Sequence, residues 1–321
     1  MFPTIRSWRR GEPAQQEYFT FWDGEWWPVE PQGSTIPPGS ETPRSFRLSV
    51  LSWNIDFMRP RSDPRMSAAL QHLEGLVHNT DHPCVILLNE MTVTDLDLIK
   101  RAGWVREGYN VTDVSPDHWE SPGYGTCMLV PRALPVKSVF RVHYEKTAME
   151  RDALFVDVAL PGGRTLRLGT SHLESLVARP PVRPGQLATA ARWLREVDGG
   201  VIGGDFNAIE AFDATLHVEN GLKDAYLETG GVEGEERGMT WGMMGPVEEK
   251  ERYGLGRLDK IMLCGAVVEV VGFETFGMDV VVEDKKTAEE LAEMMDTEKG
   301  WVTDHLGIKA EFRIEVPDPA Q

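Results

Sequence analysis

One short stretch of the chain combines strand-forming residues with two side chains able to do chemistry. Residues 201–207 have the sequence VIGGDFN, so Asp205 and Asn207 follow an apolar run two positions apart. This spacing places both side chains on the same face of an extended backbone at the end of a short buried strand. An unpaired carboxylate there costs on the order of several kcal/mol, so a metal ion, a water or a phosphoester is the expected partner. The alternative is a strand-to-loop turn in which both side chains cap local backbone amides.

Five further stretches place polar side chains at the end of an apolar run or among neighbours that are expected to be buried. These residues are Asn54 and Asp56, Glu90, His172 and Ser175, Asp259, and Asp304 with His305. Each has a structural explanation when taken alone, such as a core histidine, a salt-bridged strand aspartate or a turn cap. Six such sites together favour one shared centre, because carboxylates and imidazoles at neighbouring strand ends can meet around one cation or phosphate.

The composition limits the classes of function. The 321 residues suit a large layered α/β enzyme, and 41% of them are hydrophobic. The formal net charge of −18 argues against strong sequence-independent binding to duplex nucleic acid, which relies on neutralising phosphates. The three cysteines lie in apolar runs and are expected to be buried free thiols. We find no secretory signal and no apolar run of about 18 residues, so we expect an intracellular monomer, nuclear or cytoplasmic, without membrane contact.

The beginning of the chain differs in composition from the rest. Residues 1–43 hold seven of the 21 prolines and four of the ten tryptophans, and residues 32–42 resemble a linker. We interpret residues 1–45 as a Pro/Trp-rich N-terminal tail and residues 46–316 as a catalytic domain. Asp23 and Gly24 lie between aromatic residues and indicate a two-residue hairpin turn. The tail is therefore either a hairpin that docks on the core or binds a protein partner, or a mostly disordered segment, which the composition slightly favours.

From residue 46 onward, the pattern predicts strands and helices that build two layers of sheet. Strands are expected at 47–55, 84–88, 126–131, 136–144, 153–160, 164–171 and 308–314, in addition to the strand that ends at Asp205. Helices are expected at 64–78, at 94–102 with Thr94 as N-cap, at 183–198, and at the solvated insertion 283–299 with Leu291, Met294 and Met295 as its apolar stripe. This succession predicts two sheets packed face to face with helices outside, and the polar strand ends gathered in loops at one end.

Six motifs in order resemble those of the endonuclease/exonuclease/phosphatase superfamily. They are Trp53-Asn54-Ile55-Asp56, Leu88-Asn89-Glu90, Ser171-His172-Leu173-Glu174-Ser175, Gly204-Asp205-Phe206-Asn207, Arg257-Leu258-Asp259-Lys260-Ile261 and Thr303-Asp304-His305-Leu306-Gly307. The WNID and SHLES forms most resemble the 5′-tyrosyl-DNA phosphodiesterases, which cleave the bond between a topoisomerase tyrosine and a 5′ DNA phosphate. The resemblance implies a four-layer α/β sandwich of mainly antiparallel sheets, of the deoxyribonuclease-I-like type. It also implies a Mg²⁺ or Mn²⁺ cofactor, in-line water attack on a phosphodiester and a role in DNA repair.

The resemblance and the residue types together assign the acidic side chains. Glu90 and Asp56 are expected to bind the metal, and Asp304 either binds it or positions a ligand. Asp205 is expected to orient and deprotonate the attacking water, and Asn207 to hold a nonbridging phosphate oxygen.

The histidines are assigned to the charge that develops on the phosphoryl oxygens. His305, oriented by Asp259, and His172 are expected to stabilise this charge. Ser175, near His172, is expected to bind the substrate. Asn54 is expected to fix the water or the phosphate.

One departure from the tyrosyl-DNA enzymes bears on the substrate. Their GD-x-N motif continues with an arginine two positions after the Asn, where this chain has Ile209. The missing guanidinium removes a bidentate phosphate contact, so either another base supplies the charge or the substrate differs. Two alternatives to phosphotyrosyl-DNA are therefore kept: hydrolysis of a smaller phosphoester, such as a nucleotide, an RNA end or an inositol phosphate, and a catalytically inactive binding module recruited through the tail.

Overall fold

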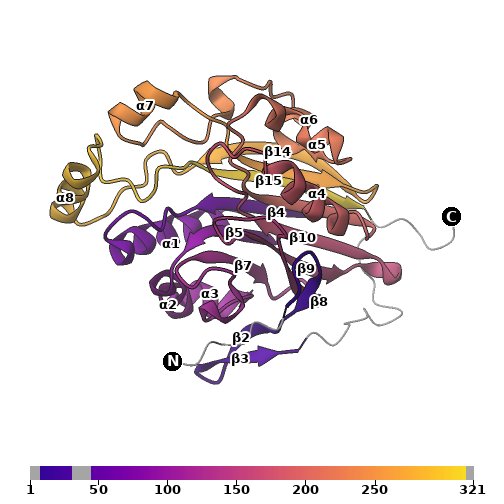
Figure 1. Cartoon of the computed structure of the whole chain (residues 1–321). Helices are drawn as coiled ribbons and strands as arrows, with labels where there is room; N and C mark the ends of the chain where they lie inside the picture. Colours follow the sequence, from indigo (N-terminus) through magenta and orange to yellow (C-terminus); the bar gives the residue numbers. More distant parts are fainter. Residues whose placement is uncertain (1–7, 31–44, 316–321) are drawn as a thin grey trace.

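Two β-sheets form the centre of the molecule in the computed structural model, which describes residues 8–30 and 45–315 (Figure 1). In spatial order, the first sheet contains β1 (Pro13–Gln15), β8 (Val136–His143), β9 (Asp152–Ala159), β10 (Thr165–Ser171), β11 (Gly199–Asp205), β13 (Asp259–Cys264) and β12 (Lys223–Asp224). The second contains β14 (Val268–Phe276), β15 (Gly307–Glu315), β4 (Ser45–Asn54), β5 (Cys84–Met91), β7 (Gly125–Pro131), β6 (Tyr109–Val111), β2 (Tyr18–Trp22) and β3 (Glu25–Val29). Neighbouring strands are antiparallel except β10 with β11 and β4 with β5. Both sheets are therefore mainly antiparallel, as predicted.

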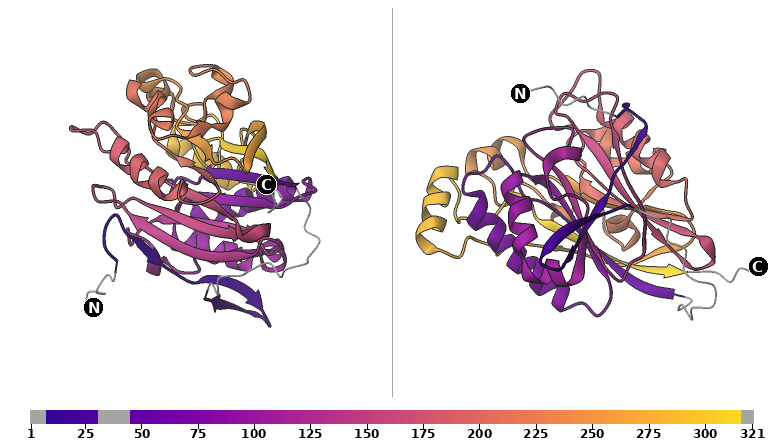
Figure 2. Two further views of the ribbon diagram at one scale, coloured as in Figure 1. Left: turned by 90° about the vertical axis from the view of Figure 1, so that its right-hand side faces the viewer. Right: turned by 90° about the horizontal axis from the view of Figure 1, so that it is seen from below.

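Helices cover the outer faces of both sheets (Figures 1 and 2). On the second sheet lie α1 (Ser62–His78), α2 (Val93–Arg101) and α3 (Gly103–Gly108), and on the first lie α4 (Arg183–Leu194) and α5 (Leu216–Glu219). The remaining helices are α6 (Ala225–Glu228), α7 (Val247–Tyr253) and α8 (Lys285–Met295). The order helix, sheet, sheet, helix is the predicted four-layer α/β sandwich.

Three apolar layers hold this sandwich together. Val156 and Phe312 belong to the cluster between the two sheets, Trp53 and Leu73 to the cluster under α1, and Ile202 to the cluster under α4. Burying one such side chain contributes about 1.5–3 kcal/mol to stability. Strands β9 and β11 are buried along their whole length because apolar residues occupy both of their faces.

Two helix predictions need correction. The N-cap of α2 is Thr92 and not Thr94, because the Thr92 hydroxyl accepts from the Asp95 amide while the Asp95 carboxylate accepts from the Thr92 amide. On α8, Leu291 is buried but Met294 is 60% exposed, so Met294 is not part of the apolar stripe.

The N-terminal segment contributes strands to both sheets. Asp23 and Gly24 have φ of 50° and 87° and form the predicted two-residue turn between β2 and β3. Strand β2 pairs with β6, and β1 pairs with β8. The interpretation of a mostly disordered tail is therefore wrong for residues 8–30. The linker predicted at 32–42 lies outside the described residues, and a domain boundary at residue 45 stays a prediction.

Within the described residues, no helix combines the length and the apolar character needed to cross a membrane.

Candidate active site

The polar strand ends converge at one end of the sandwich. Asp205 is the last residue of β11, and its cross-strand partner on β13 is Asp259. Asn54 ends β4, beside Asn89 of β5, and the Asn54 amide donates to Asp205 Oδ2 at 3.0 Å. Side chains from both sheets therefore meet directly, as the spacing of polar residues after apolar runs predicts.

Several residues at this end have unusual backbone conformations. Asp56, Glu90 and Asn207 have φ of 57°, 58° and 46°. Glu90 lies where the pairing of β5 with β7 is irregular, and such a bulge turns a side chain out of the normal alternation. Strained positive φ values in residues other than glycine are concentrated at functional sites, since the surrounding fold must stabilise them.

Gly204 is required where β11 passes β10. A Cβ at this position would lie 1.9 Å from the Ser171 carbonyl oxygen, and the φ of Gly204 is 150°. Only glycine allows this approach, which brings Asp205 next to the residues that follow β10.

Asp205 is the common neighbour of both histidines. Its Oδ2 lies 3.3 Å from His172 Nε2 and 3.8 Å from His305 Nε2, while its Oδ1 accepts from the backbone N–H of Asn207. Burial alone would raise the pKa of Asp205, but His305 and His172 hold it well below its usual value. Asp205 therefore stays ionised and accepts hydrogen bonds over the ordinary pH range.

His305 is held as an imidazolium. Its Nδ1 lies 2.7 Å from Asp259 Oδ2, and its Nε2 faces Asp205 and Asp304. Burial lowers the pKa of His305, but Asp259, Asp304 and Asp205 outweigh burial and raise it well above the usual value. Burial raises the pKa of Asp259 to about 6, so both partners are charged near neutral pH. His305 and Asp259 are therefore in contact, and the orienting role of Asp259 stays a prediction.

His172 has the opposite charge state. Burial, followed by the charge of Arg151, lowers its pKa to about 4, so the ring is neutral. The Arg151 guanidinium contacts His172 Nδ1, and because arginine only donates, the ring proton must lie on Nε2. That nitrogen faces Asp205 and Glu90, and among the described residues no acceptor meets it with hydrogen-bond geometry. A buried N–H in this state can donate to a phosphoryl oxygen.

Arg151 joins His172 to Ser175. Its second terminal nitrogen donates to Ser175 Oγ at 3.1 Å, and its guanidinium carbon lies 5.0 Å from the centre of the Tyr124 ring. Among the described residues, the Arg151 guanidinium forms no ion pair with a carboxylate, although the side chain is buried. Arg151 is therefore a buried positive charge at the site. The arginine that the tyrosyl-DNA enzymes have two positions after the Asn of GD-x-N is replaced by Ile209 in this chain.

Two further acidic side chains, Glu90 and Asp56, lie around Asn54, which also donates to Asp205. Asn54 donates to Glu90 Oε1 at 3.2 Å, and its Oδ1 accepts from the Asp56 amide. Burial, Asp304 and Glu90 raise the pKa of Asp56 to about 7. Burial also raises the pKa of Glu90. Carboxylates that raise one another's pKa in this way are stabilised by a cation between them.

The donor set fits a hard divalent cation. Side-chain ligand atoms of Glu90, His172 and Asp205 lie within 4.8 Å of one another, and Asp205, Asp259 and His305 form a second such group. Because His172 carries its proton on Nε2 and His305 is protonated on both ring nitrogens, the carboxylates of these two groups are the available ligands. Carboxylate oxygens are the ligands that Mg²⁺ prefers. Asp56 and Asp304 belong to neither group within the described part of the chain, so their role as ligands stays a prediction.

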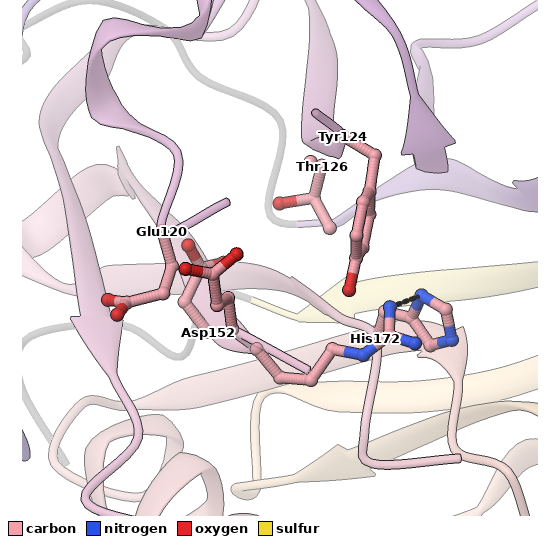
Figure 3. Close-up of a pocket in the computed structure, with 8 residues that line it drawn as sticks. Glu120, Tyr124, Thr126, Asp152 and His172 are labelled. Carbon is pink, nitrogen blue, oxygen red and sulfur yellow. Dashed lines mark hydrogen bonds between the residues drawn. The ribbon is translucent and has the colours of Figure 1, made fainter. Parts of the chain in front are cut away.

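A small cavity opens beside His172 and Arg151 (Figure 3). Its remaining lining residues are Glu120, Tyr124, Gly125, Thr126, Glu150 and Asp152. Its volume of about 10 Å³ has room for about one water. In Figure 3, Glu120 and Asp152 lie on one side of the cavity and His172 on the other.

Three contributors to the site were missed in the sequence. Arg151 lies in the connection between β8 and β9, Arg59 makes an ion pair with Asp56 at 2.9 Å, and the Trp241 indole donates to Asp304 Oδ2 at 2.8 Å. None of them follows an apolar run, so the signal that located the other residues is absent. The basic residue next to the WNID motif and the Thr-Trp pair before β13 were the available hints.

The chain resembles known proteins in sequence and in fold. The 5′-tyrosyl-DNA phosphodiesterase of Caenorhabditis elegans is 27% identical over 199 residues, which cover 60% of this chain and 51% of that protein. The chain thus spans about half the length of the curated relatives it matches. The crystal structure of a humanized D. rerio TDP2 with 14 mutations has a TM-score of 0.63 and 20% identity, with 83% of this chain and 98% of the other covered.

A more distant structure has the same fold. The endonuclease/exonuclease/phosphatase from Bacteroides vulgatus has a TM-score of 0.60 and 16% identity, with 84% of this chain and all of the other covered. The sequence model described as the Endonuclease/Exonuclease/phosphatase family matches residues 51–305, which contain every predicted site residue from Asn54 to His305. The chain belongs to the endonuclease/exonuclease/phosphatase family.

Proposed function

We propose that the protein is a Mg²⁺-dependent phosphodiesterase that hydrolyses its substrate by in-line water attack. The observation that carries the proposal is the position of Asp205, an ionised buried carboxylate between a neutral His172 and a protonated His305. An ionised acceptor flanked by two donors is suited to holding a water against a phosphoryl group whose oxygens gain charge.

Asp205 orients the attacking water and accepts its proton in the transition state. Because its pKa is low, we assign more of its effect to orientation than to basicity. Asn54, hydrogen-bonded to both Asp205 and Glu90, fixes the water or the phosphate between them. The side-chain Nδ2 of Asn207 donates to the Leu173 carbonyl oxygen. This bond orients the Asn207 side chain toward the loop after β10, where a nonbridging oxygen would lie.

The divalent cation would be held by Glu90, with Asp56 and Asp304 as the proposed additional carboxylates. When bound, it polarises a phosphoryl oxygen and stabilises the leaving oxygen. Arg59, through its ion pair with Asp56, and Trp241, through its bond to Asp304, keep these two carboxylates in place.

The phosphoryl oxygens would be bound by the two histidines beside Asp205. His305 brings a full positive charge, and His172 brings the N–H that Arg151 directs by occupying its other nitrogen. Ser175, which accepts from Arg151, contacts the substrate next to His172. Arg151 thereby supplies the local positive charge that Ile209 does not.

The proposed substrate is a 5′-phosphotyrosyl DNA end, because the Caenorhabditis relatives are named 5′-tyrosyl-DNA phosphodiesterases. The proposed role is in DNA repair. A smaller phosphoester is the second candidate. The net charge of −18 and the aliphatic Ile209 favour it, since both weaken contact with a long polyanion.

The test is a panel of substrates with and without Mg²⁺. The purified protein should hydrolyse bis(p-nitrophenyl) phosphate and a 5′-phosphotyrosyl oligonucleotide with Mg²⁺, and EDTA should abolish turnover. Abasic DNA, RNA and inositol phosphates in the same panel separate the two candidates. Asp205→Asn should reduce kcat by about 10²-fold or more, because it removes the acceptor of the water proton. No Mg²⁺-dependent turnover on any phosphoester would refute the proposal.

A further inference from the structure

We propose that Thr240 is a positioning residue of the active site, whose hydroxyl group holds the Asp259 carboxylate in the direction that His305 requires. The inference deepens the proposed phosphodiesterase function and rests on it. It starts from two observations. One oxygen of Asp259 is buried without a hydrogen-bond partner among the described residues, and the buried Thr240 hydroxyl beside this residue has a proton left to donate.

The two carboxylate oxygens of Asp259 differ in their contacts. Its Oδ2 lies 2.7 Å from His305 Nδ1. Its Oδ1 is buried, and no donor of the described residues meets it with good hydrogen-bond geometry. A buried carboxylate oxygen without a donor costs free energy, and a second donor there would stop the carboxyl group from turning away from His305.

The Thr240 hydroxyl is held with its oxygen already used as an acceptor. Thr240 has no exposed surface, and its Oγ1 accepts from the backbone N–H groups of Leu258 at 3.1 Å and Asp259 at 3.0 Å. A hydroxyl oxygen has two lone pairs, so both are occupied and its own proton is left to donate. Burial raises the pKa of Asp259 to about 6, and both His305 and the Thr240 hydroxyl oppose this rise. The Thr240 proton is therefore available to the Asp259 carboxylate.

The backbone at Thr240 reaches the other member of the pair. The Thr240 carbonyl oxygen accepts from the Leu306 amide at 2.7 Å, directly after His305 in the chain. The next residue, Trp241, forms a β-bridge with His305. Thr240 thus contacts the Asp259 side of the hydrogen bond through its side chain and the His305 side through its backbone.

The proposed role gives a specific kinetic effect. Valine has nearly the shape of threonine but no hydroxyl, so Thr240→Val removes the hydrogen bonds and retains the volume. The Asp259 carboxylate would then be free to turn, and the His305 ring would lose its fixed direction. Because His305 is proposed to act on charge that develops in the transition state, the loss should appear in kcat and not in KM.

The first test compares Thr240→Val with two further variants. Steady-state kinetics on bis(p-nitrophenyl) phosphate with Mg²⁺ are measured well below the thermal midpoint of each variant. We expect kcat to fall about tenfold in Thr240→Val with KM within about twofold. Thr240→Ser keeps the hydroxyl and should stay within about threefold of the wild type. Thr165→Val is the matched control, because Thr165 is buried at the beginning of β10, where its Oγ1 accepts from Lys137, and its kcat should be unchanged.

Combination with Asp259→Asn shows whether Thr240 acts through Asp259. In that background no carboxylate is left to direct, so Thr240→Val should lower kcat by less than about threefold further. A further tenfold loss would overturn the proposal, as would a Thr240→Val variant with the kcat of the wild type or a Thr240→Ser variant as slow as Thr240→Val. If Thr240→Val does not fold, Thr240→Ser and Thr240→Ala carry the same comparison, since they differ by one hydroxyl.

A second measurement needs no turnover. The proton on His305 Nδ1 is shared with a carboxylate 2.7 Å away, so it should give a downfield ¹H NMR resonance that Asp259→Asn removes. This resonance should shift in Thr240→Val and stay in place in Thr240→Ser, and an unchanged resonance in Thr240→Val would overturn the proposal. A wild-type protein that has the resonance but turns over no phosphoester would refute the proposed function and not the positioning role.

Discussion

Replacing Asp259 by Asn tests the electrostatic arrangement most directly, because it removes the charge that keeps His305 protonated. Asp259 Oδ2 lies 2.7 Å from His305 Nδ1, and both side chains are buried. A hydrogen bond between charged groups contributes about 1.5–3 kcal/mol. If the imidazolium stabilises the phosphoryl oxygens only in the transition state, losing this contribution should reduce kcat about 10- to 150-fold.

The pH dependence should change together with the rate. The folded-state pKa of His305 is raised, so its contribution to stability is fully present below the unfolded pKa and is lost as pH rises through the folded value. In Asp259→Asn that folded pKa is lower, so the alkaline fall in kcat should begin at a lower pH than in the wild type. Steady-state rates between about pH 6 and pH 9 with saturating Mg²⁺ measure both effects.

Asp157→Asn is the matched control for this variant. Asp157 on β9 makes a buried ion pair with Arg167 of β10 at 2.6 Å, in the middle of the sheet and apart from the polar strand ends. Breaking it should lower stability by about 3–5 kcal/mol and leave the kcat of the folded protein unchanged. An Asp259→Asn variant with kcat within twofold of the wild type over this pH range would show that His305 does not depend on Asp259.

Three further outcomes follow from single positions. Ile209→Arg should raise kcat/KM several-fold for a 5′-phosphotyrosyl oligonucleotide but not for bis(p-nitrophenyl) phosphate, and an unchanged preference would show that position 209 does not face the substrate. Burial and neighbouring carboxylates raise the pKa of Asp56 to about 7, so Mg²⁺ binding should release close to one proton at about pH 6 and close to none at about pH 8. Calorimetry in two buffers measures this release, and equal values at both pH values would contradict it. Gly204→Ala should lower the free energy of unfolding in urea by about 3 kcal/mol or more, because its methyl group would meet the Ser171 carbonyl oxygen; a loss below about 1 kcal/mol would count against this.

The candidate site could be predicted because its residues are tied to strand ends. Asp205 and Asp259 are cross-strand partners, and Asn54 is paired with Asn89 on the neighbouring strand. An apolar run marks where a strand lies, and the polar residue after it marks where the strand leaves the core. Strands packed in one sandwich end at the same edges, so local patterns were sufficient to bring these side chains together.

Contacts made by connecting segments could not be predicted in the same way. Arg151 contacts His172 only because β9 and β10 are adjacent, and its own surroundings in the sequence carry no periodicity. The hairpin around Asp23 shows the same limit. The turn could be predicted from Asp23 and Gly24 alone. The position of the hairpin in the fold, however, depends on the free edge of β6, where Phe19 of β2 pairs with Val111. Composition favoured disorder because prolines and glycines are common there, whereas pairing with an existing sheet edge supplied the missing stability.

The distribution of arginines bears on how an acidic chain would carry out the proposed hydrolysis of a phosphate ester. The arginines buried in the described structure are Arg59, Arg65, Arg141, Arg151, Arg167, Arg183 and Arg257. All except Arg151 contact a carboxylate or a backbone carbonyl oxygen through the guanidinium. Binding a long polyanion requires accessible cations along its path, and this chain has an excess of acidic residues. We infer that affinity comes from the reacting phosphate itself, through Arg151, His305 and a divalent cation. A centre of this kind suits a single DNA end or a small phosphoester better than a tract of duplex.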